Sequence, residues 1–463
     1  MKHNKVFVLL PDGIGLRNFV FSSFPAIGDH MGFEVTYWNQ TSFDLSELGC
    51  RDLKLYGKAS SKTDLYKRAR KEIELKKFEG QFQDDIYRKY SFKPLITTLK
   101  QRIKKGLVQY YILKYKGNKL SRLRDKIKAS ERKTAFYKSC VETLKKEKPD
   151  FVFCTNQRPV NAISPILAAQ DVGIPTATFI FSWDNVPKAT MVLETDYYFV
   201  WSVHMKNELL TYYPYINEAQ IHVTGTPQFE CHFQKELVLS KDEFINWNNL
   251  PKGVDYICFS GDDVTTSPYD PQYLEATAKA VRQLNDKGYN IVILFRKCPV
   301  DFSNRFDLVL KTYKDVVYEV SPKWEKRGVY WNEIMPLKED VLQLFNTIYY
   351  SKLVINVGSS MVFDFICHNK PCAYMNYNPK AIENLKDIHT IYKYVHFRSM
   401  PTRESVVWLN NSDMISEQLE TMLNDENQTV LSSAKKWFNI IAGEEPQRAS
   451  ENIWKTIKGI LNA

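Results

Sequence analysis

Residues 352–376 read Lys352-Leu-Val-Ile-Asn-Val-Gly-Ser-Ser-Met-Val-Phe-Asp-Phe-Ile-Cys-His-Asn-Lys-Pro-Cys-Ala-Tyr-Met-Asn376. The apolar run that ends at Asn356 predicts a buried strand, the Gly-Ser-Ser turn predicts the start of a helix, and a second strand follows Lys-Pro. Backbone N–H groups and small hydroxyls at Gly358, Ser359 and Ser360 suit an anion such as a phosphate. The carboxylate of Asp364, near the end of the second helical turn, suits ribose hydroxyls. The stretch therefore predicts a nucleotide site.

The bulk properties of the chain predict two domains. Its 463 residues are too many for one hydrophobic core, and 44% of them are hydrophobic, which is enough for two. The apolar run from Val6 to Leu10 is too short for a signal peptide, and no apolar window approaches the ~20 residues that cross a bilayer. The eight cysteines include no Cys-x-x-Cys pair, so neither a zinc site nor a disulfide framework is expected. We expect a cytoplasmic protein.

The positive charge of the chain is concentrated in one segment. The net charge is +10, but residues 61–148 contain 27 Lys and Arg against 10 Asp and Glu. Apolar residues recur there at helical spacing, and Pro94 is the only proline, so the segment is expected to be mostly helical. It is either a solvated helical face or a surface that adheres to anionic lipid headgroups. Nucleic acid is the weaker alternative, because no nucleic-acid module accompanies the charge.

Strand and helix signals alternate in both halves, as parallel sheets with helical crossovers require. We predict an α/β chain of two Rossmann-like domains, with a basic helical insertion at about 51–148. The predicted domains span 1–235 and 236–435, and 436–463 is expected to form one C-terminal helix. Predicted strands and helices of the first half are 5–10, 18–31, 33–38, 150–154, 163–170, 173–181, 197–201 and 221–224. Predicted strands of the second half are 255–259, 290–295, 353–356 and 372–375.

Ligands of open parallel sheets bind beyond the carboxyl ends of the strands, so the residues after each strand are the candidates. After the first strand comes Pro11-Asp-Gly-Ile-Gly-Leu-Arg-Asn18. With Asn18 in the third position, this is a weak dinucleotide fingerprint, and NAD or FAD is not expected. We interpret Gly13, Gly15 and Asn18 as a flexible loop that lines a cleft. Asp12 is either a general base that points into the cleft or an Asx-turn residue.

Two further strand ends in the first half carry candidate residues. Ser182-Trp-Asp-Asn185 and Lys188 place an indole, a carboxylate, an amide and an amine together, although Asp184 and Asn185 could simply form a turn and cap. Trp183 is a candidate cleft residue with them. In Val223-Thr-Gly-Thr-Pro227, Gly225 and Thr226 either allow backbone to approach a ligand or form a tight turn.

In the second half, Ser260 and Asp262 follow one strand, and Arg296 and Lys297 follow the next. The two cations could bind a diphosphate, or they could form surface salt bridges. His368 is interpreted as a packing or capping residue. No His, Asp or Glu cluster has metal-ligand spacing, and no P-loop is present.

Several of these motifs resemble a known group of enzymes. Phe181-Ser-Trp-Asp-Asn-Val-Pro-Lys188, Tyr198-Phe-Val-Trp-Ser202 and Val223-Thr-Gly-Thr-Pro-Gln-Phe229 resemble bacterial surface-carbohydrate glycosyltransferases of the GT-B type. Leu294-Phe-Arg-Lys-Cys-Pro-Val-Asp301, Pro336-Leu-Lys-Glu-Asp340 and Gly358-Ser-Ser-Met-Val-Phe-Asp-Phe365 are similar to that group and to the CDP-glycerol glycerophosphotransferases. The resemblance covers roughly residues 1–40 and 150–380 and excludes the basic insertion.

The resemblance implies two Rossmann-like domains that face a cleft, with the acceptor held by the first and the nucleotide donor by the second. It places the donor phosphates at residues 358–360 and the ribose at Asp364. Two departures are Cys298, where the group usually has His, and Asp364, where Glu is commoner.

The expected activity is transfer of a sugar from a nucleotide-activated donor to a hydroxyl of a surface glycan or lipid-linked acceptor, on the inner face of the cell membrane. We assign the base role to Asp12 or Asp184 and the stabilisation of the leaving phosphate to Arg296, Lys297 and the 358–360 turn. No metal or resident cofactor is expected. The alternatives are a CDP-glycerol-type polyol-phosphate transferase, a nucleotide-sugar 2-epimerase and a non-catalytic scaffold on the membrane surface.

Overall fold

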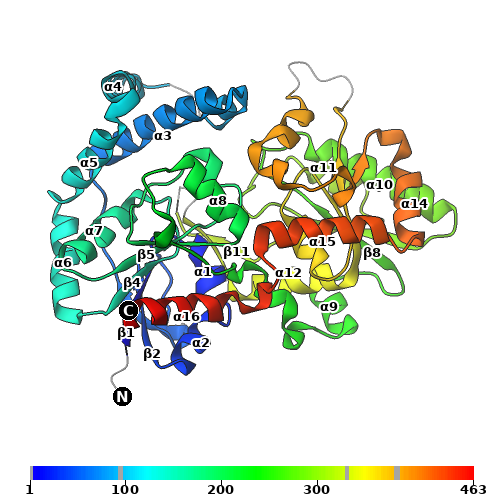
Figure 1. Ribbon diagram of the computed structural model, residues 1–463. Coiled ribbons are helices and arrows are strands. Elements are labelled where there is room, and N and C mark those ends of the chain that lie inside the picture. Colours follow the sequence, from blue (N-terminus) through cyan, green and yellow to red (C-terminus); the bar gives the residue numbers. More distant parts are fainter. Residues whose placement is uncertain (1–3, 92–96, 329–332, 380–385) are drawn as a thin grey trace. The chain divides into compact units, whose positions relative to one another are not determined.

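The computed structural model describes residues 4–91, 97–328, 333–379 and 386–463. The chain forms two compact units, one made of residues 1–227 with 448–463 and the other of residues 228–447 (Figure 1). This division places the end of the first unit before the predicted boundary at 235. It also returns the last residues of the chain to the first unit. Each unit is built on its own parallel sheet.

The first unit has a seven-stranded parallel sheet with the order β3-β2-β1-β4-β5-β6-β7. Its central strands are near-continuous apolar runs, as strands covered on both faces require. Val6 to Leu10 of β1, for example, are fully buried. The strands are β1 (Asn4–Leu10), β2 (Phe33–Asn39), β3 (Arg51–Lys54), β4 (Phe151–Cys154), β5 (Thr176–Phe179), β6 (Tyr197–Val200) and β7 (Ile221–Val223).

The predicted strands of this half are confirmed, with shorter bounds for the one expected at 173–181. β3 was not predicted, because its sequence Arg-Asp-Leu-Lys has no apolar run. The helix predicted at 18–31 is instead two short helices, α1 (Ile14–Phe19) and α2 (Phe24–His30). Pro25 explains the break, because proline is favoured in the first turn of a helix and disfavoured inside one.

The other helices of this unit cover its sheet or extend from it. They are α3 (Ser61–Phe82), α4 (Leu99–Tyr115), α5 (Leu120–Glu131), α6 (Ala135–Glu147), α7 (Ile163–Asp171), α8 (Val203–Tyr212) and α16 (Ala449–Asn462). Phe136, Cys140 and Leu144 of α6 pack in the core beside β4 and α7, so α6 is the crossover helix that precedes β4. The predicted insertion at 51–148 therefore contains two elements of the Rossmann-like fold, β3 and α6. The added part is α3, α4 and α5.

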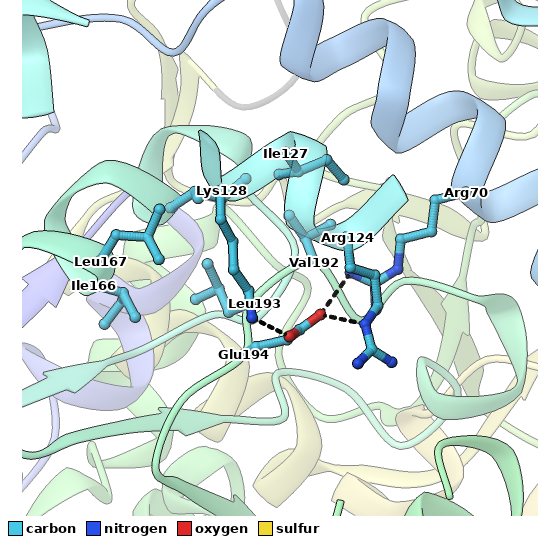
Figure 2. Close-up of a pocket in the computed structure, with 10 residues that line it drawn as sticks. Arg70, Arg124, Ile127, Lys128, Ile166, Leu167, Val192, Leu193 and Glu194 are labelled. Carbon is cyan, nitrogen blue, oxygen red and sulfur yellow. Dashed lines mark ion pairs between the residues drawn. The ribbon is translucent and has the colours of Figure 1, made fainter. Parts of the chain in front are cut away.

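Buried polar contacts attach the added helices to the core of the unit. The Glu194 carboxylate lies 2.9 Å from Nε of Arg124, 2.6 Å from Nζ of Lys128 and 3.6 Å from Nη1 of Arg70 (Figure 2). Burial raises the pKa of Glu194, but the three cations outweigh burial and the net pKa is lowered. Glu131 accepts from Ser164 Oγ at 2.7 Å and from the Ser60 amide at 2.9 Å. The added helices are therefore fixed to the sheet rather than loosely appended.

The second unit has a six-stranded parallel sheet with the order β10-β9-β8-β13-β14-β15, and β11 and β12 form a separate two-stranded antiparallel sheet. The large strands are β8 (Asp255–Ser260), β9 (Ile291–Arg296), β13 (Ser351–Asn356) and β14 (Cys372–Met375), as predicted. The short strands escaped prediction: β10 (Val317–Glu319), β11 (Trp324–Lys326), β12 (Ile334–Pro336) and β15 (Val407–Leu409). The helices are α9 (Lys241–Asn248), α10 (Asp270–Asp286), α11 (Asp307–Thr312), α12 (Lys338–Tyr350), α13 (Met361–Ile366), α14 (Ile415–Asn424) and α15 (Gln428–Ala442).

The prediction of a single helix at 436–463 is wrong, because the structure has two helices there. α15 ends at Ala442 and is followed by Gly443, which has φ +85°, and α16 begins at Ala449, after Pro446. Trp437 of α15 packs on Phe363 in the second unit. Trp454 of α16 stacks on Phe24 and donates from Nε1 to its carbonyl at 2.8 Å in the first unit. The apolar periodicity of both helices is real, but they cover different sheets.

Candidate active site

Both sheets have the strand order of a doubly wound Rossmann fold, in which ligands bind at the point where the order reverses. In the first unit this point lies between β1 and β4, and in the second it lies between β8 and β13. Asp12 follows β1, Ser260 ends β8, and Gly358 follows β13. Sequence reasoning therefore placed Asp12, Ser260 and Gly358 at the two switch points without knowing the strand order. Its candidates Asp184 and Arg296 lie instead at the ends of β5 and β9.

Asp12 spans the switch point of the first unit. Its side chain is buried, and it accepts from the amide of Ile14 at 3.2 Å and from Nδ2 of Asn156, the second residue after β4, at 3.0 Å. Burial raises the pKa of Asp12 to about 6, while the Ile14 amide, the charge of Arg158 and the Asn156 amide oppose part of that rise. The carboxylate is thus mainly ionised at neutral pH and still basic enough to accept a proton.

The segment after Asp12 is packed rather than the flexible loop that was expected. Gly13 caps α1, and Asn18 is only 3% exposed. A Cβ at Gly15 would lie 2.6 Å from Oγ1 of Thr155, so only glycine allows the helix to approach β4 this closely. Gly15 has a packing role, and its predicted contact with a ligand remains a prediction.

A second polar cluster follows β5. Asp184 accepts from Oγ of Ser182 and Nδ2 of Asn185, both at 2.8 Å, and pairs with Nζ of Lys188. Trp183 is 8% exposed and Asn185 is 4% exposed, so this strand end is held tightly. The turn-and-cap alternative and the site interpretation fit these contacts equally.

Asn156 and Gln157 connect the two clusters of the first unit. Asn156 donates to Asp12, while Nε2 of Gln157 donates to Oδ1 of Asn185 at 3.0 Å. Oε1 of Gln157 accepts from the Phe181 amide at 2.9 Å. The predicted residues after β1 and β5 are therefore joined through the residues after β4, which sequence reasoning did not single out. The rule that ligands bind beyond the carboxyl ends of parallel strands would have identified Asn156 and Gln157 if it had been applied to the end of β4.

Glu208 is another group that the sequence analysis missed. It lies on α8, and burial followed by the charge of Asp184 raises its pKa to about 8. A protonated carboxyl beside the Asp184 cluster can donate a proton at neutral pH. Glu208 is a single acidic residue on a short helix, and nothing in the sequence distinguishes it from an ordinary solvent-exposed residue.

The remaining candidates of the first unit follow β7. Gly225 has φ +80°, a conformation that favours glycine, and Thr226 is fully buried. No hydrogen-bonded turn is assigned to the described residues 224–226, so the tight-turn alternative is not confirmed. Contact of these residues with a ligand remains a prediction.

In the second unit, Ser260 and Asp262 lie at the end of β8. Burial, then the charges of Asp270 and Asp263, raise the pKa of Asp262 to about 8. Burial raises the pKa of Asp270 to about 7. Arg305 donates from Nη2 to the Asp262 carbonyl at 2.6 Å and therefore fixes this loop. The carboxyls of Asp262 and Asp270 can therefore be protonated at neutral pH, and this reduces the negative charge that would repel an anionic ligand.

Arg296 and Lys297 differ in their surroundings. Nη2 of Arg296 donates to both carboxylate oxygens of Asp340, at 2.9 and 3.0 Å, in a buried pair. Nη1 of Arg296 is buried and has no hydrogen-bond partner among the residues that the structure describes. Lys297 is more accessible and donates from Nζ to the Ser303 carbonyl at 2.5 Å. The salt-bridge alternative is therefore present for Arg296, but the pair with Asp340 is buried, whereas the sequence analysis expected a surface pair. Burial raises the pKa of Cys298, which follows them, to about 12.

The turn after β13 has the conformation that its glycine predicts. Gly358 has φ +65°, and a Cβ there would lie 2.9 Å from Cζ of Phe397. The Ser359 amide donates to Oδ1 of Asn356 at 2.8 Å, and Ser360 caps α13 without a side-chain hydrogen bond to the helix. The helix has only six residues, so any anion binding here would depend on the amides and hydroxyls of the turn itself.

Asp364 lies in a buried chain of three residues. Nε2 of His232 lies 2.9 Å from Oδ1 of Asp364, and Nδ1 of His232 lies 3.1 Å from Nε2 of His368. Burial lowers the pKa of His232, but Cys231 and Asp364 outweigh it and the net pKa is raised to about 9. Burial and the charge of His232 lower the pKa of His368 to about 3. His232 is therefore the protonated member and donates to both neighbours.

His368 packs against the rings of Phe345 and Tyr349, which confirms the packing alternative expected for it, and the contact with His232 adds a polar partner. The ribose contact predicted for Asp364 remains a prediction, since one carboxylate oxygen already accepts from His232. In the part of the chain that the structure describes, no group of three or more His, Cys, Asp or Glu could hold a metal ion. No helix within the described ranges is both long enough and apolar enough to span a bilayer.

Comparison with solved structures finds proteins similar to this one over its whole length. The UDP-GlcNAc 2-epimerase of Neisseria meningitidis, bound to UDP-GlcNAc, matches with a TM-score of 0.54 and 12% identity, covering 98% of this chain and 100% of that one. The UDP-GlcNAc 2-epimerase of Methanocaldococcus jannaschii matches with 0.53 and 13%, covering 98% and 99%. A glycosyltransferase of Rickettsia africae matches with 0.52 and 11%, covering 99% of each chain. No protein-family model and no curated protein sequence matches.

These similarities establish the fold. The chain has the two Rossmann-like units of the GT-B type, as the sequence predicted. The identities are too low to carry more than the fold to this chain.

Proposed function

We propose that the protein is a glycosyltransferase that moves a sugar from a nucleotide-activated donor to a hydroxyl of a surface glycan or a lipid-linked acceptor. The fold supports a nucleotide-sugar substrate, because the similar epimerase from Neisseria meningitidis is bound to UDP-GlcNAc. We place the reaction on the cytoplasmic face of the cell membrane, in the synthesis of a cell-envelope polysaccharide. The basic segment 61–148 supports that location.

The observation that carries the proposal is Asp12. A transferase needs a base for the acceptor hydroxyl, and the best base has a pKa near the working pH. Asp12 is a buried carboxyl at the switch point of the first unit, and its pKa is raised to about 6. Asp184, held by Ser182, Asn185 and Lys188, is the second candidate.

The donor is assigned to the second unit. In this proposal, the amides of Gly358 and Ser360 and the hydroxyls of Ser359 and Ser360 bind the donor phosphates, since the Ser359 amide already donates to Asn356. Lys297 and Nη1 of Arg296, which has no hydrogen-bond partner among the described residues, add positive charge. These fixed donors would stabilise the negative charge that develops on the leaving nucleotide. The proposed mechanism uses no metal ion.

A nucleotide-sugar 2-epimerase is the second candidate. It is favoured by the similar structures from Neisseria meningitidis and Methanocaldococcus jannaschii, which are UDP-GlcNAc 2-epimerases. An epimerase alters the donor sugar without any acceptor, whereas a transferase releases the nucleotide only when an acceptor receives the sugar. The polyol-phosphate transferase predicted from the sequence would instead consume CDP-glycerol.

The test begins with binding. The melting temperature of the purified protein is measured with UDP, GDP, CDP, CMP and TDP, and one nucleotide is expected to raise it, since ~2.7 kcal/mol of stabilisation follows when ligand is present at about 100 times its Kd. Stabilisation by none of them at millimolar concentration would favour a non-catalytic scaffold. The variant Lys297→Gln, which removes a proposed phosphate-binding charge, is tested for a smaller nucleotide-induced rise in melting temperature. Lys252→Gln, at an exposed ion pair of the second unit, is its control.

The second step identifies the reaction. UDP-GlcNAc and other sugar derivatives of the bound nucleotide are incubated with and without lipid-linked glycan acceptors, and the products are separated. Nucleotide release that requires acceptor supports the transferase. A changed donor sugar in the absence of acceptor establishes the epimerase instead. Near-normal turnover in both Asp12→Asn and Asp184→Asn would refute both base assignments.

A further inference from the structure

One helix of the basic segment has an apolar face that is exposed in the part of the chain that the structure describes. Large hydrophobic side chains on α4 are exposed at five positions: Leu99 (73%), Ile103 (58%), Leu107 (38%), Tyr110 (52%) and Leu113 (66%). Their spacings of three and four residues place them on one face of the helix. Monomeric proteins rarely expose a contiguous stripe of this kind without a partner for it.

The opposite face of α4 is already used. Ile112 and Tyr115 are buried, and they pack with Ala69 and Ile73 of α3 and Leu123 of α5. The exposed stripe is therefore not the packing face of a helix that has come away from its unit. It is a second apolar face, directed away from α3.

Positive charge borders this stripe on both sides. Lys100, Arg102, Lys105 and Lys114 are exposed on α4, and the helix contains no acidic residue. A nearby groove of about 790 Å³, which Leu113 also lines, adds Lys76, Lys77 and Lys116. The exposed half of α4 thus combines an apolar stripe with basic flanks and no acidic residue, and these are the features by which helices bind the interface of an anionic membrane.

The rest of the unit holds α4 firmly. α3 and α5 are tied to the core by Glu194 with Arg70, Arg124 and Lys128 (Figure 2). The capping box at Thr98 and Gln101 fixes the first turn of α4 itself. The stripe is therefore presented in a fixed orientation, which lowers the entropy that binding would cost.

We propose that α4 docks the protein on an anionic lipid bilayer by inserting the stripe of Leu99, Ile103, Leu107, Tyr110 and Leu113 between the headgroups. This narrows the adhesion expected of residues 61–148 to one helix and adds a hydrophobic component to it. The proposal does not rest on the proposed enzymatic function, because vesicle binding needs neither donor nor acceptor.

The test measures the partition of the full-length protein onto vesicles of phosphatidylcholine with 30% phosphatidylglycerol, and onto vesicles of phosphatidylcholine alone. Ile103→Ser with Leu113→Ser is expected to lower the partition coefficient at least about tenfold, because the removed methylene groups no longer enter the interface. Leu48→Ser with Val203→Ser is the matched control, since these side chains are 42% and 63% exposed elsewhere in the same unit. The control pair is expected to bind as the unchanged protein does.

Charge is tested separately. Arg102→Gln with Lys105→Gln is expected to weaken binding by about thirtyfold at low salt and much less at high salt. Slower amide hydrogen exchange across α4 on vesicle addition would support insertion, and unaltered melting temperatures show that the variants are folded. The proposal is overturned if the unchanged protein does not bind the anionic vesicles, if the stripe variant binds as well as its control, or if α4 exchanges at the same rate with and without vesicles.

Discussion

Replacing Asp12 with Asn removes the proposed base and leaves a side chain of the same shape. In the folded protein the carboxyl is buried and its pKa is about 6, compared with 3.8 for an unperturbed Asp. The folded state therefore keeps its proton up to about pH 6, while the unfolded chain releases it near pH 4. Between these values the folded state binds more protons, so stability falls as pH rises through this window.

The size of the effect follows from the shift. About two pKa units correspond to roughly 3 kcal/mol of destabilisation that is complete above pH 6 and absent below pH 4. Asn carries no charge and avoids this cost. It loses ~1 kcal/mol if its amide cannot accept from Asn156 as the carboxylate does. We therefore expect Asp12→Asn to be more stable than the unchanged protein by about 2 kcal/mol at pH 8, and to have no such advantage at pH 4.

Chemical denaturation of both proteins at the two pH values measures this difference. Asp29→Asn, at an exposed position in the same unit, is the control and should change stability little at either pH. The same Asp12 variant should lose turnover by ~10² to 10⁴. In the unchanged protein, turnover should fall about tenfold between pH 7 and pH 5, as the base becomes protonated. A variant that is no more stable at pH 8, or one that retains full turnover, would refute the reasoning about this carboxyl.

Three other perturbations follow from the second unit. Gly358→Ala should destabilise the protein by ~1–3 kcal/mol, measured by denaturation, because φ +65° is strained for alanine; an unchanged midpoint would contradict this. Asp340→Asn should cost ~3–5 kcal/mol, since it leaves Arg296 buried without its counter-charge; a loss below ~1 kcal/mol would show that the pair is dispensable. The pairing of His232 with Asp364 should stabilise the fold fully below about pH 6.5, because the pKa of the His232 imidazole is raised in the folded state, and this stabilisation should be lost as pH rises through about 9. A free energy of unfolding that does not change across this pH range would contradict the pairing.

Much of the fold could be predicted from the sequence, because buried parallel strands such as β1, β8 and β13 are long apolar runs. The strands that were missed, including β3 and β15, are short and lie at sheet edges, where neighbouring structure rather than composition decides their conformation. The two C-terminal helices were merged because both have an apolar face, although Gly443 and Pro446 between them are sequence signals for a helix end. Which sheet each helix covers is a tertiary fact that local periodicity does not contain.

The candidate site was predictable where one residue type at a strand end carries the signal, as for Asp12 and Gly358. It was not predictable where function depends on pairing. The partners of Arg296 and Asp364 are Asp340 and His232, which are far away in sequence and come from other elements. Asn156 could have been found by the same strand-end reasoning, since it lies just beyond the end of β4.

The central claim is that the second unit binds the diphosphate of a nucleotide sugar at the switch point between β8 and β13. The most direct measurement is a crystal structure of the protein with the nucleotide sugar that raises its melting temperature most. We predict diphosphate oxygens within hydrogen-bond distance of the Gly358 and Ser360 amides and the Ser359 and Ser360 hydroxyls, with Nζ of Lys297 beside them. A nucleotide bound elsewhere, with that turn in contact only with solvent or protein, would contradict the account.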